Sequence, residues 1–384
     1  MKKRAERLTV ILFCVIIASL SLAFLLLPDR EFSPQENRAL ASFPELNAET
    51  FFSGDFGKEM NLYFADQFPL RTAFVKLKGG AELGMLRGEN NGVLYSYDQL
   101  AVKNFNAYKS ILESTEDTDR IYAASIRAQL ESLARFGESA GIPIVTLIPP
   151  RTIDVADSSF SYDRPDGDLL YDLASALLKD KAGYVDTLSL FREKYEAGEY
   201  VYYRTDHHWT TLGAYYAYCE VMDALGKADD ILPREAFEVE QTESFSGTTA
   251  ARGNFPFYRK DVLELWRLPD DGEYEILADG EPLDGFYALH HLSESDKYAV
   301  FLDGTHNLTT VKKRGEERET LLVAKDSFAN CLIPFLAREY DVVAVNIHTI
   351  TSLSAAAETY GADAILILCN GENLITTGDL GKIK

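Results

Sequence analysis

The sequence predicts an α/β fold in which helices cover both faces of a parallel sheet, with a β-rich insertion and an N-terminal transmembrane helix. From about residue 117, short and continuously apolar strands alternate with amphipathic helices, which is typical of a sheet buried on both sides. Residues 235–318 interrupt this pattern with short strand-like runs between glycines and aspartates. An uncharged segment, residues 8–27, lies near the N-terminus.

The N-terminal segment is long enough to cross a membrane. About 20 uncharged residues at a helical rise of about 1.5 Å span the roughly 30 Å hydrocarbon layer. Basic residues precede the run, which predicts a cytoplasmic N-terminus and an extracytoplasmic main domain. A cleaved signal peptide is the alternative, although no Ala-x-Ala site stands before Pro28. We therefore expect residues 1–27 to be a single-pass cell-membrane anchor or a signal.

The segments between this helix and the alternating region have three characters. Residues 28–50 are polar and contain several prolines, which predicts a tether. Residues 51–80 are rich in aromatic residues and are predicted to be helical. Residues 90–102 place an Asn-Gly turn signal among alternating apolar residues, which predicts a hairpin. We place the main domain at residues 51–384, with the insertion at about 235–318.

Apolar spacing defines the elements of the alternating region. Helical spacing predicts a helix ending near Gly141 and further helices near 170–177, 210–225, 328–339 and 354–362. Apolar runs predict strands at 142–148, 184–187, 319–326, 342–347 and 364–369. In an open sheet of this kind, binding sites lie at the carboxyl ends of the strands.

Composition narrows the class of protein. With 384 residues, 46% of them hydrophobic, the chain is neither disordered nor a small disulfide scaffold. Sixty acidic residues against 38 basic ones give a formal net charge of −22, which argues against nucleic acid as a partner. We interpret Cys219, Cys331 and Cys369 as buried small hydrophobes.

The first candidate site is the segment Thr205–Thr210. In an extended segment, residues i and i+2 point the same way, so Asp206 and His208 would meet and His207 would face away. A carboxylate that accepts a bond from His208 Nδ1–H leaves Nε2 free as a base. A helix cap with a structural histidine is one alternative, and a metal site is another. Adjacent residues rarely bind one metal ion together. The chain has a second pair of adjacent histidines, His290-His291, which we expect in a strand.

The second candidate is Ser327, which joins a predicted buried strand to an amphipathic helix. There its own N–H, at the helix N-terminus, can stabilise an oxyanion. Ordinary helix capping is the alternative. A serine nucleophile needs a base, and the base needs an orienting acid. Ser327, His208 and Asp206 supply all three at strand ends of one predicted sheet, so we predict that they form a catalytic triad.

These residues also carry a family resemblance. Asp206-His207-His208-Trp209 resembles the signature of the DHHW protein family. Followed by Asp326-Ser327-Phe328, it is similar to the SGNH-hydrolase-like proteins of alginate O-acetylation. Shorter stretches that resemble this group are Glu36–Leu40, Asp66–Arg71 and Phe245–Thr248. The resemblance covers about residues 34–375.

The resemblance implies an SGNH-hydrolase-like α/β/α sandwich, the same triad, and acyl-ester chemistry on a carbohydrate. The order of the triad residues is the reverse of that in common SGNH hydrolases and fits the alginate-type arrangement. Lys325 stands where a glycine is usual. The resemblance also implies additional oxyanion donors, for which Gly247 and Asn370 are our candidates. Arg151 is a candidate for substrate contact.

We therefore expect extracytoplasmic transfer of an acyl group, acetyl in the simplest case, to or from hydroxyls of a cell-envelope or secreted polysaccharide. Ester, serine and hydroxyl complete this chemistry, so we expect no metal and no other cofactor. The resemblance implies a membrane-bound O-acyltransferase as acyl donor. A carbohydrate acetylesterase and a non-catalytic glycan-binding envelope protein are the alternatives.

Overall fold

The computed structural model describes residues 2–33, 38–103, 117–160 and 168–383. It divides into two compact units, Met1–Arg87 with Asn254–Pro256, and Gly88–Gly253 with Phe257–Lys384. The sequence analysis placed residues 51–384 in one domain, whereas this division falls within that range.

The first unit is helical. Helix α1 (Lys2–Leu26) contains a stretch, Arg4–Leu26, with a mean hydropathy of 2.8 and no buried residue. It is long and apolar enough to cross a membrane, which fits a single-pass anchor or a signal sequence. Helices α2 (Ala48–Ser53), α3 (Asp55–Gln67) and α4 (Arg71–Gly84) follow, as the sequence predicted. Of the stretch Glu36–Leu40, which was singled out by resemblance, Glu36 and Asn37 lie outside the described residues.

Large apolar side chains of this unit are exposed. Phe52 is 85% exposed and Leu77 is 68% exposed. In α3 only Tyr63 and Asp66 are buried, and in α4 only Gly79. These two helices therefore bury few of their side chains.

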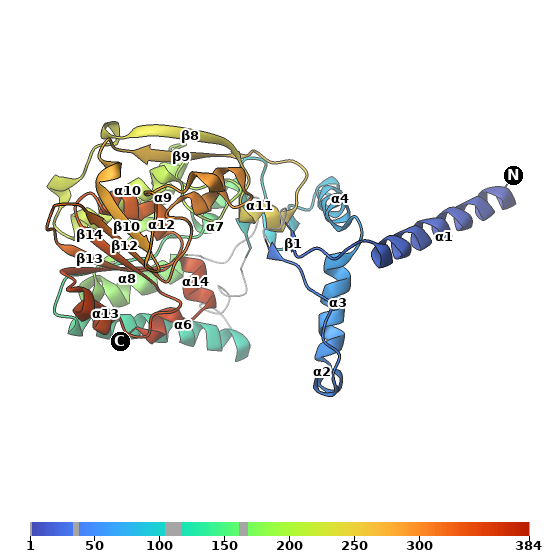
Figure 1. Ribbon diagram of the computed structural model, residues 1–384, viewed down its shortest axis with the longest axis horizontal. Coiled ribbons are helices and arrows are strands. Elements are labelled where there is room, and N and C mark those ends of the chain that lie inside the picture. Colours follow the sequence, from blue (N-terminus) through green and yellow to red (C-terminus); the bar gives the residue numbers. More distant parts are fainter. Residues whose placement is uncertain (1, 34–37, 104–116, 161–167, 384) are drawn as a thin grey trace. The chain divides into compact units, whose positions relative to one another are not determined.

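The second unit contains an eight-stranded sheet (Figure 1). Its strands, in spatial order, are β11 (Glu281–Pro282), β10 (Tyr274–Ala278), β12 (Leu308–Lys313), β14 (Asp341–Asn346), β13 (Thr320–Lys325), β15 (Ala364–Leu368), β6 (Ile144–Leu147) and β7 (Tyr184–Val185). The five strands from β14 to β7 are parallel. The three at the other edge are antiparallel. The prediction of a mainly parallel sheet is confirmed.

Alternating side chains of each central strand enter two different cores. On β13, Leu321 and Val323 belong to one apolar cluster, and Leu322 and Ala324 belong to the other, as the two-residue period of a strand requires. The first cluster is covered by α9 (Thr187–Glu196), α10 (Thr211–Ala224) and α12 (Ala329–Leu336). The second is covered by α6 (Asp117–Ser139), α8 (Asp168–Ala182), α13 (Leu353–Tyr360) and α14 (Gly371–Thr376).

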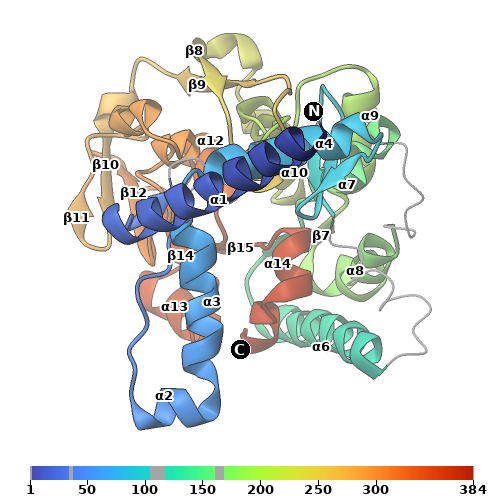
Figure 2. The same ribbon diagram turned by 90° about the vertical axis from the view of Figure 1, so that its right-hand side faces the viewer.

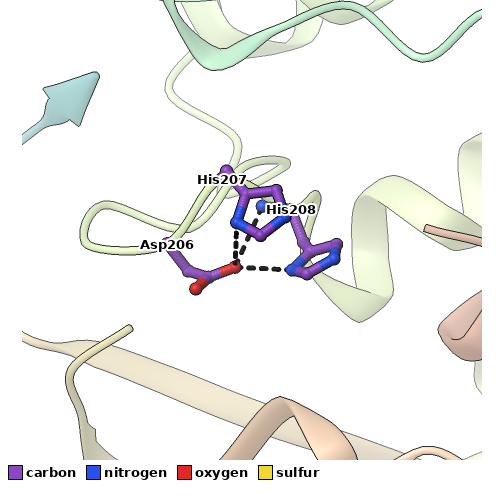
Figure 3. A group of neighbouring side chains, drawn as sticks. All are labelled: Asp206, His207 and His208. Carbon is purple, nitrogen blue, oxygen red and sulfur yellow. Dashed lines mark hydrogen bonds and ion pairs between the residues drawn. The ribbon is translucent and has the colours of Figure 1, made fainter. Parts of the chain in front are cut away.

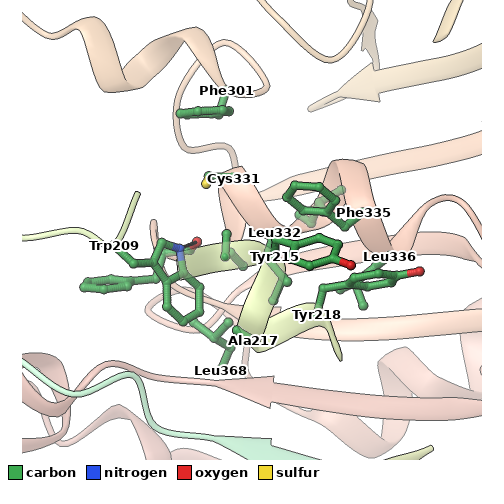
Figure 4. Packing of buried hydrophobic residues seen from close by; sticks show 14 of the residues in the cluster. Trp209, Tyr215, Ala217, Tyr218, Phe301, Cys331, Leu332, Phe335, Leu336 and Leu368 are labelled. Atoms are coloured by element: carbon green, nitrogen blue, oxygen red, sulfur yellow. Dashed lines mark hydrogen bonds between the residues drawn. The ribbon is translucent and has the colours of Figure 1, made fainter. Parts of the chain in front are cut away.

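Figures 1 and 2 show these helices on opposite sides of the sheet, so the predicted α/β/α sandwich is confirmed. Figure 4 shows how aromatic side chains fill the first core. Tyr218 of α10 stacks on Phe335 of α12 at 5.7 Å between ring centroids, and Trp209 packs nearby. Such pairs stabilise a core beyond the area they bury. They fix α10 and α12, which begin directly after the two candidate segments.

The predicted hairpin near residue 90 is present. Strands β3 (Glu89–Asn90), β4 (Val93–Tyr95) and β5 (Leu100–Val102) form a small antiparallel sheet. Asn91 and Gly92, which connect the first two strands, have φ values of 51° and 73°. Such left-handed positions are what an Asn-Gly hairpin turn requires.

The region 235–318 is β-rich, but part of it continues the main sheet. Strands β8 (Glu238–Phe245) and β9 (Asp261–Arg267) pair with each other, while β10 and β12 form the antiparallel edge of the main sheet through β14. The expectation of a strand at His290-His291 is wrong. Both lie in the 3-10 helix η5 (Leu289–Ser293), where backbone bonds such as His291 N to the Ala288 carbonyl form locally.

Candidate active site

The loop at residues 203–208 is bent back on itself. A bridge between Tyr202 and Trp209 closes its ends, and the Tyr203 N–H donates to the His208 carbonyl over 3.2 Å. The extended geometry assumed from the sequence is therefore wrong. Alternation of side chains applies only to extended backbone, and here the chain curls around one carboxylate.

Asp261 is the buried group that shapes the start of this loop. It is 1% exposed and accepts hydrogen bonds from the backbone N–H groups of Arg204, at 2.6 Å, and Thr205, at 2.9 Å. The hydroxyls of Thr205 and Tyr200 also donate to it. Burial raises the pKa of Asp261, while these donors act against that rise. A carboxylate from β9 thus organises a loop more than fifty positions earlier.

The structure brings Asp206, His208 and Ser327 into one line of hydrogen bonds. Asp206 Oδ1 lies 2.6 Å from His208 Nδ1 and accepts the His208 backbone N–H at 3.1 Å (Figure 3). On the other side of the ring, His208 Nε2 lies 2.8 Å from Ser327 Oγ. Asp206 and His208 are buried, at 2% and 5% exposure. The carboxylate fixes the imidazole tautomer with the proton on Nδ1, which leaves Nε2 as a base toward the hydroxyl.

Thr248 completes the shell of Asp206. Its N–H and its hydroxyl donate to Asp206 Oδ2 at 2.8 and 2.9 Å. Burial alone would raise the pKa of Asp206, but the adjacent histidines and the Thr248 backbone bond hold that pKa well below its usual range. The carboxylate is therefore ionised, as an orienting acid must be.

Gly247 has a different place from the one expected. Its N–H donates to Thr205 Oγ1 at 2.9 Å, so that donor is already engaged. A Cβ on Gly247 would lie 2.3 Å from Asp206 Oδ2 and 2.4 Å from Asp206 Cβ. Only glycine lets the backbone approach the carboxylate this closely. Gly247 thus packs against Asp206 instead of offering an oxyanion donor.

His207 lies beside the triad instead of facing away. Its ring centroid is 3.8 Å from that of His208, and its Nδ1 is 2.8 Å from Thr248 Oγ1. Because that hydroxyl donates to Asp206, it accepts the proton of His207 Nδ1–H. Burial, and then the neighbouring His208, lower the pKa of His207. A neutral His207 therefore keeps Nε2 as an acceptor.

The turn that carries Ser327 is held by Asp326. Its Oδ1 accepts the Phe328 N–H at 3.0 Å, and its Oδ2 accepts from the N–H and side-chain amide of Asn370, both at 2.7 Å. Asn373 donates to the same oxygen at 3.0 Å. Asn370 Oδ1 in turn caps α14. The candidate oxyanion donor Asn370 is thus a support of the serine turn.

Lys325 precedes this turn and is fully buried. Its Nζ donates to Asn330 Oδ1, and Asn330 Nδ2 donates to the Gly304 carbonyl at 3.0 Å and to Thr305 Oγ1 at 3.2 Å. Burial lowers the pKa of Lys325 to about 8. This lysine, which stands where the resembled group carries glycine, connects the start of α12 to the loop at 304–305.

A cavity of about 240 Å³ lies beside the triad. Polar, charged and apolar residues line it: Val102, Arg151, Thr152, Ile153, His207, Thr248, Thr249, Arg252, Phe328, Asn370 and Glu372. Arg151 lines the cavity, but its guanidinium is paired with both carboxylate oxygens of Asp154 at 3.0 and 3.1 Å. Its Nη1 also lies 3.5 Å from Glu372. Arg151 is therefore held rigidly at the wall.

Two groups in the described part of the chain have the ligand types for a metal ion: Asp206 with His207 and His208, and His290 with His291 and Asp303. In the first group the ligand atoms bond to one another, to Thr248 and to Ser327. A metal ion bound to these atoms would have to break those hydrogen bonds.

Sequence reasoning missed Thr248 as a partner of Asp206, and it missed Asp261 and Tyr298. Tyr298, 4% exposed, stacks on the His208 ring with centroids 3.7 Å apart. The stretch Phe245–Thr248 was singled out by resemblance, which was the signal available for Thr248. Asp261 and Tyr298 lie in the insertion, where no local pattern connects them to the triad.

The chain is similar to a known protein family and to several solved structures. The model of the DHHW protein family matches residues 169–346, so the resemblance to that family is confirmed. No curated protein matches the sequence. A DHHW family protein from Eubacterium siraeum DSM 15702 is similar in structure, with a TM-score of 0.56 and 16% identity, over 76% of this chain and 95% of that chain.

Two further solved structures are similar. Bacillus cereus PatB1 with a sulfonyl adduct has a TM-score of 0.60 and 16% identity, over 76% of this chain and 98% of that chain. The O-acetyltransferase domain of Pseudomonas putida AlgJ is more distant, with a TM-score of 0.45 and 15% identity, over 74% of this chain and 93% of that chain. The fold is thus shared with the DHHW protein and PatB1.

Proposed function

With the DHHW match as premise, we propose that this protein transfers an acyl group, acetyl in the simplest case, to or from a hydroxyl of a cell-envelope or secreted polysaccharide. The observation that supports this proposal is the line of hydrogen bonds from Asp206 through His208 to Ser327, with distances of 2.6 and 2.8 Å. A carboxylate, an imidazole and a hydroxyl in this order are the parts of a nucleophilic serine.

Transfer proceeds in two balanced steps. His208 Nε2 takes the Ser327 hydroxyl proton as Oγ attacks the ester carbonyl carbon. Collapse of the tetrahedral intermediate breaks the bond to the donor oxygen, which leaves with the proton from His208. An acceptor hydroxyl then gives its proton to His208 and attacks the acyl-serine, and Ser327 recovers its proton. Asp206 stabilises the imidazolium in both steps.

We assign the oxyanion to the backbone N–H of Ser327. Among the described residues this N–H donates to no hydrogen bond, and Ser327 lies two residues before Ala329, the first residue of α12. The Gly247 N–H already donates to Thr205, and the Asn370 backbone N–H and one N–H of its side-chain amide already donate to Asp326. We therefore give them positioning roles.

The cavity beside the triad is where we place the acceptor sugar. His207, which lines it, offers Nε2 as an acceptor for a sugar hydroxyl. Arg151 and Glu372 offer further polar contacts at the same wall. Binding of this kind orients one hydroxyl toward the acyl-serine, which contributes to the rate by fixing the reacting groups.

The N-terminal helix agrees with a reaction outside the cell membrane. We propose that α1 anchors the chain and that the second unit works on the extracytoplasmic side. An acyl donor must reach that side. The family resemblance names the class of partner, a membrane-bound O-acyltransferase that passes acetyl groups across.

The test uses the full chain in detergent micelles with an aryl acetate as donor, with and without an oligosaccharide acceptor. We expect acetylated oligosaccharide as product, and Ser327→Ala should abolish it. Ser293→Ala, which removes an exposed serine, is the matched control and should keep full activity. Free acetate without acetylated sugar would assign the carbohydrate esterase instead. Equal rates for wild type and Ser327→Ala would exclude Ser327 as the nucleophile of either reaction, and no product above background with wild type would leave a glycan-binding protein.

A further inference from the structure

We infer that Tyr298 is a positioning residue for His208: its ring holds the imidazole toward Ser327 and favours the imidazolium that forms during acyl transfer. This inference rests on the proposed function. It also assigns a role to the insertion at residues 235–318, because Tyr298 lies in its 3-10 helix η6 (Lys297–Val300).

The two rings are stacked face to face. The centroids of His208 and Tyr298 lie 3.7 Å apart and the ring planes differ by 4°. Phe328 approaches the same imidazole at 4.8 Å with a tilt of 55°, and His207 lies at 3.8 Å with a tilt of 38°. The imidazole is therefore enclosed by rings, and rotation away from Ser327 would require one of them to move.

The hydroxyl of Tyr298 ties the same side chain to the nucleophile. It donates to the Ser327 carbonyl at 3.2 Å, with the Phe328 carbonyl at 3.5 Å. Trp209 Nε1 donates to that Phe328 carbonyl at 3.1 Å. Burial raises the pKa of Tyr298 well above its ordinary value, so the hydroxyl stays a donor. One side chain thus contacts both the base and the serine turn.

The segment that carries Tyr298 is itself braced. Tyr287 and Phe301 form a β-bridge, and the Leu302 N–H donates to the Phe286 carbonyl at 2.9 Å. A platform fixed in this way loses little entropy when it holds a neighbouring ring, which is what a positioning residue needs.

The stacking geometry also favours charge on the imidazole. The face of an aromatic ring is electron-rich and attracts a cation placed over it, more strongly in a desolvated site. The titratable groups in contact with His208 are Asp206 and His207 on its own loop and Tyr298 on η6. Asp326, next to Ser327, acts electrostatically on His207 and on Tyr298. Asp206 stabilises the imidazolium through its bond with Nδ1, whereas Tyr298 stabilises it through the face of the ring. Substitutions can therefore separate the two effects.

The experiment compares Tyr298→Phe, Tyr298→Leu and Tyr298→pentafluorophenylalanine in the full chain. Tyr298→Phe keeps the ring and should retain kcat within about 5-fold. Tyr298→Leu should lower kcat by about 30- to 100-fold, the size of effect that a small misplacement produces. Pentafluorophenylalanine keeps the shape of the ring but reverses the sign of the electrostatic potential at its face. It should move the midpoint of the acid limb of kcat/KM down by about half to one pH unit relative to Tyr298→Phe.

Tyr274→Leu is the matched control, since it removes a buried tyrosine of the same insertion, on β10, whose ring contacts that of Phe286 at 5.0 Å between centroids. It should leave the acid limb unchanged. The second readout does not need catalysis: with ¹³C-labelled histidine, the His208 signal is assigned by its loss in His208→Gln and titrated in each variant. If the titration midpoint of His208 is the same in Tyr298→pentafluorophenylalanine as in Tyr298→Phe, the inference is overturned, whatever the activity of the two variants. Failure of the proposed function would appear separately, as an unaffected Ser327→Ala.

Discussion

The molecule contains two clusters of adjacent histidines with acidic partners, and they differ in what faces the second ring nitrogen. His208 has a carboxylate 2.6 Å from Nδ1 and the Ser327 hydroxyl 2.8 Å from Nε2. His291 has Glu294 2.8 Å from Nδ1 and Asp303 2.7 Å from Nε2. The first ring is buried, while the second cluster lies at the surface with His290 exposed.

This difference separates a base from an ion pair. Burial would lower the pKa of His291, but hydrogen bonds to Glu294 and Asp303 outweigh it and raise that pKa. In its protonated form, an imidazole between two carboxylates donates at both nitrogens and has no lone pair to offer. One carboxylate with one hydroxyl leaves a basic nitrogen aimed at a nucleophile. The partner of the second nitrogen, more than the residue composition, thus decides the chemistry.

The largest contrast is expected from replacing the two histidines. His208→Gln should lower kcat/KM for an aryl acetate by about 10³- to 10⁴-fold, because Ser327 loses its base. His291→Gln should change it by less than about 3-fold. A steady-state assay of the full chain in micelles measures both. Comparable losses in the two variants would remove the distinction between the clusters.

Replacing the acidic partners of the two histidines, Asp206 and Asp303, should give a smaller contrast in kcat/KM in the same direction. Asp206→Asn should lower kcat/KM by about 10²- to 10³-fold, since an amide no longer stabilises the imidazolium. Asp303→Asn, in the second cluster, should leave the rate within about 3-fold of wild type. The same steady-state assay measures both variants. If Asp206→Asn keeps the kcat/KM of wild type, Asp206 only shapes the loop.

The close packing around Asp206 gives a third contrast. Gly247→Ala places a Cβ 2.3 Å from Asp206 Oδ2, so we expect a loss of about 2–3 kcal/mol in the free energy of unfolding and about 10²-fold in kcat/KM. Gly272→Ala is the control, because its Cβ meets nothing within 4 Å. Denaturant unfolding and the ester assay should both leave the control unchanged.

The smallest effect concerns pH and the second cluster. A histidine whose pKa is raised on folding stabilises the folded state below its unfolded pKa of about 6.5, and this stabilisation is lost as pH rises through the folded pKa. His291→Gln should therefore cost less than about 1 kcal/mol of unfolding free energy near pH 5.5. The difference should vanish near pH 9. Equal differences at both values would mean that packing, not charge, is what His291 contributes.

The parts of the fold set by local patterns were predictable from the sequence. Strand β13 follows from an apolar run and helix α10 from helical spacing. Ser327 comes directly after β13, at its carboxyl end, and the Asp206–Trp209 loop comes directly before α10. The conformation of that loop was not predictable, because Asp261 shapes it from a distant strand. The same holds for Thr248 and Tyr298, whose contacts with the triad depend on how the insertion folds back.

The candidate roles divided in the same way. Gly247 and Asn370 lie close to the predicted triad, but their donors bond to Thr205 and Asp326. Sequence order and resemblance indicated the neighbourhood of these residues. The direction of one N–H or one amide depends on backbone turns that no local spacing encodes.

The most direct test of a nucleophilic Ser327 is covalent capture. The full chain is treated with a sulfonyl fluoride, digested, and mapped by mass spectrometry. We expect the label on Ser327 in wild type and in His291→Gln, and little label in His208→Gln, since the hydroxyl reacts only when a base removes its proton. Absence of label on Ser327, or equal labelling of Ser327 in His208→Gln, would contradict the account.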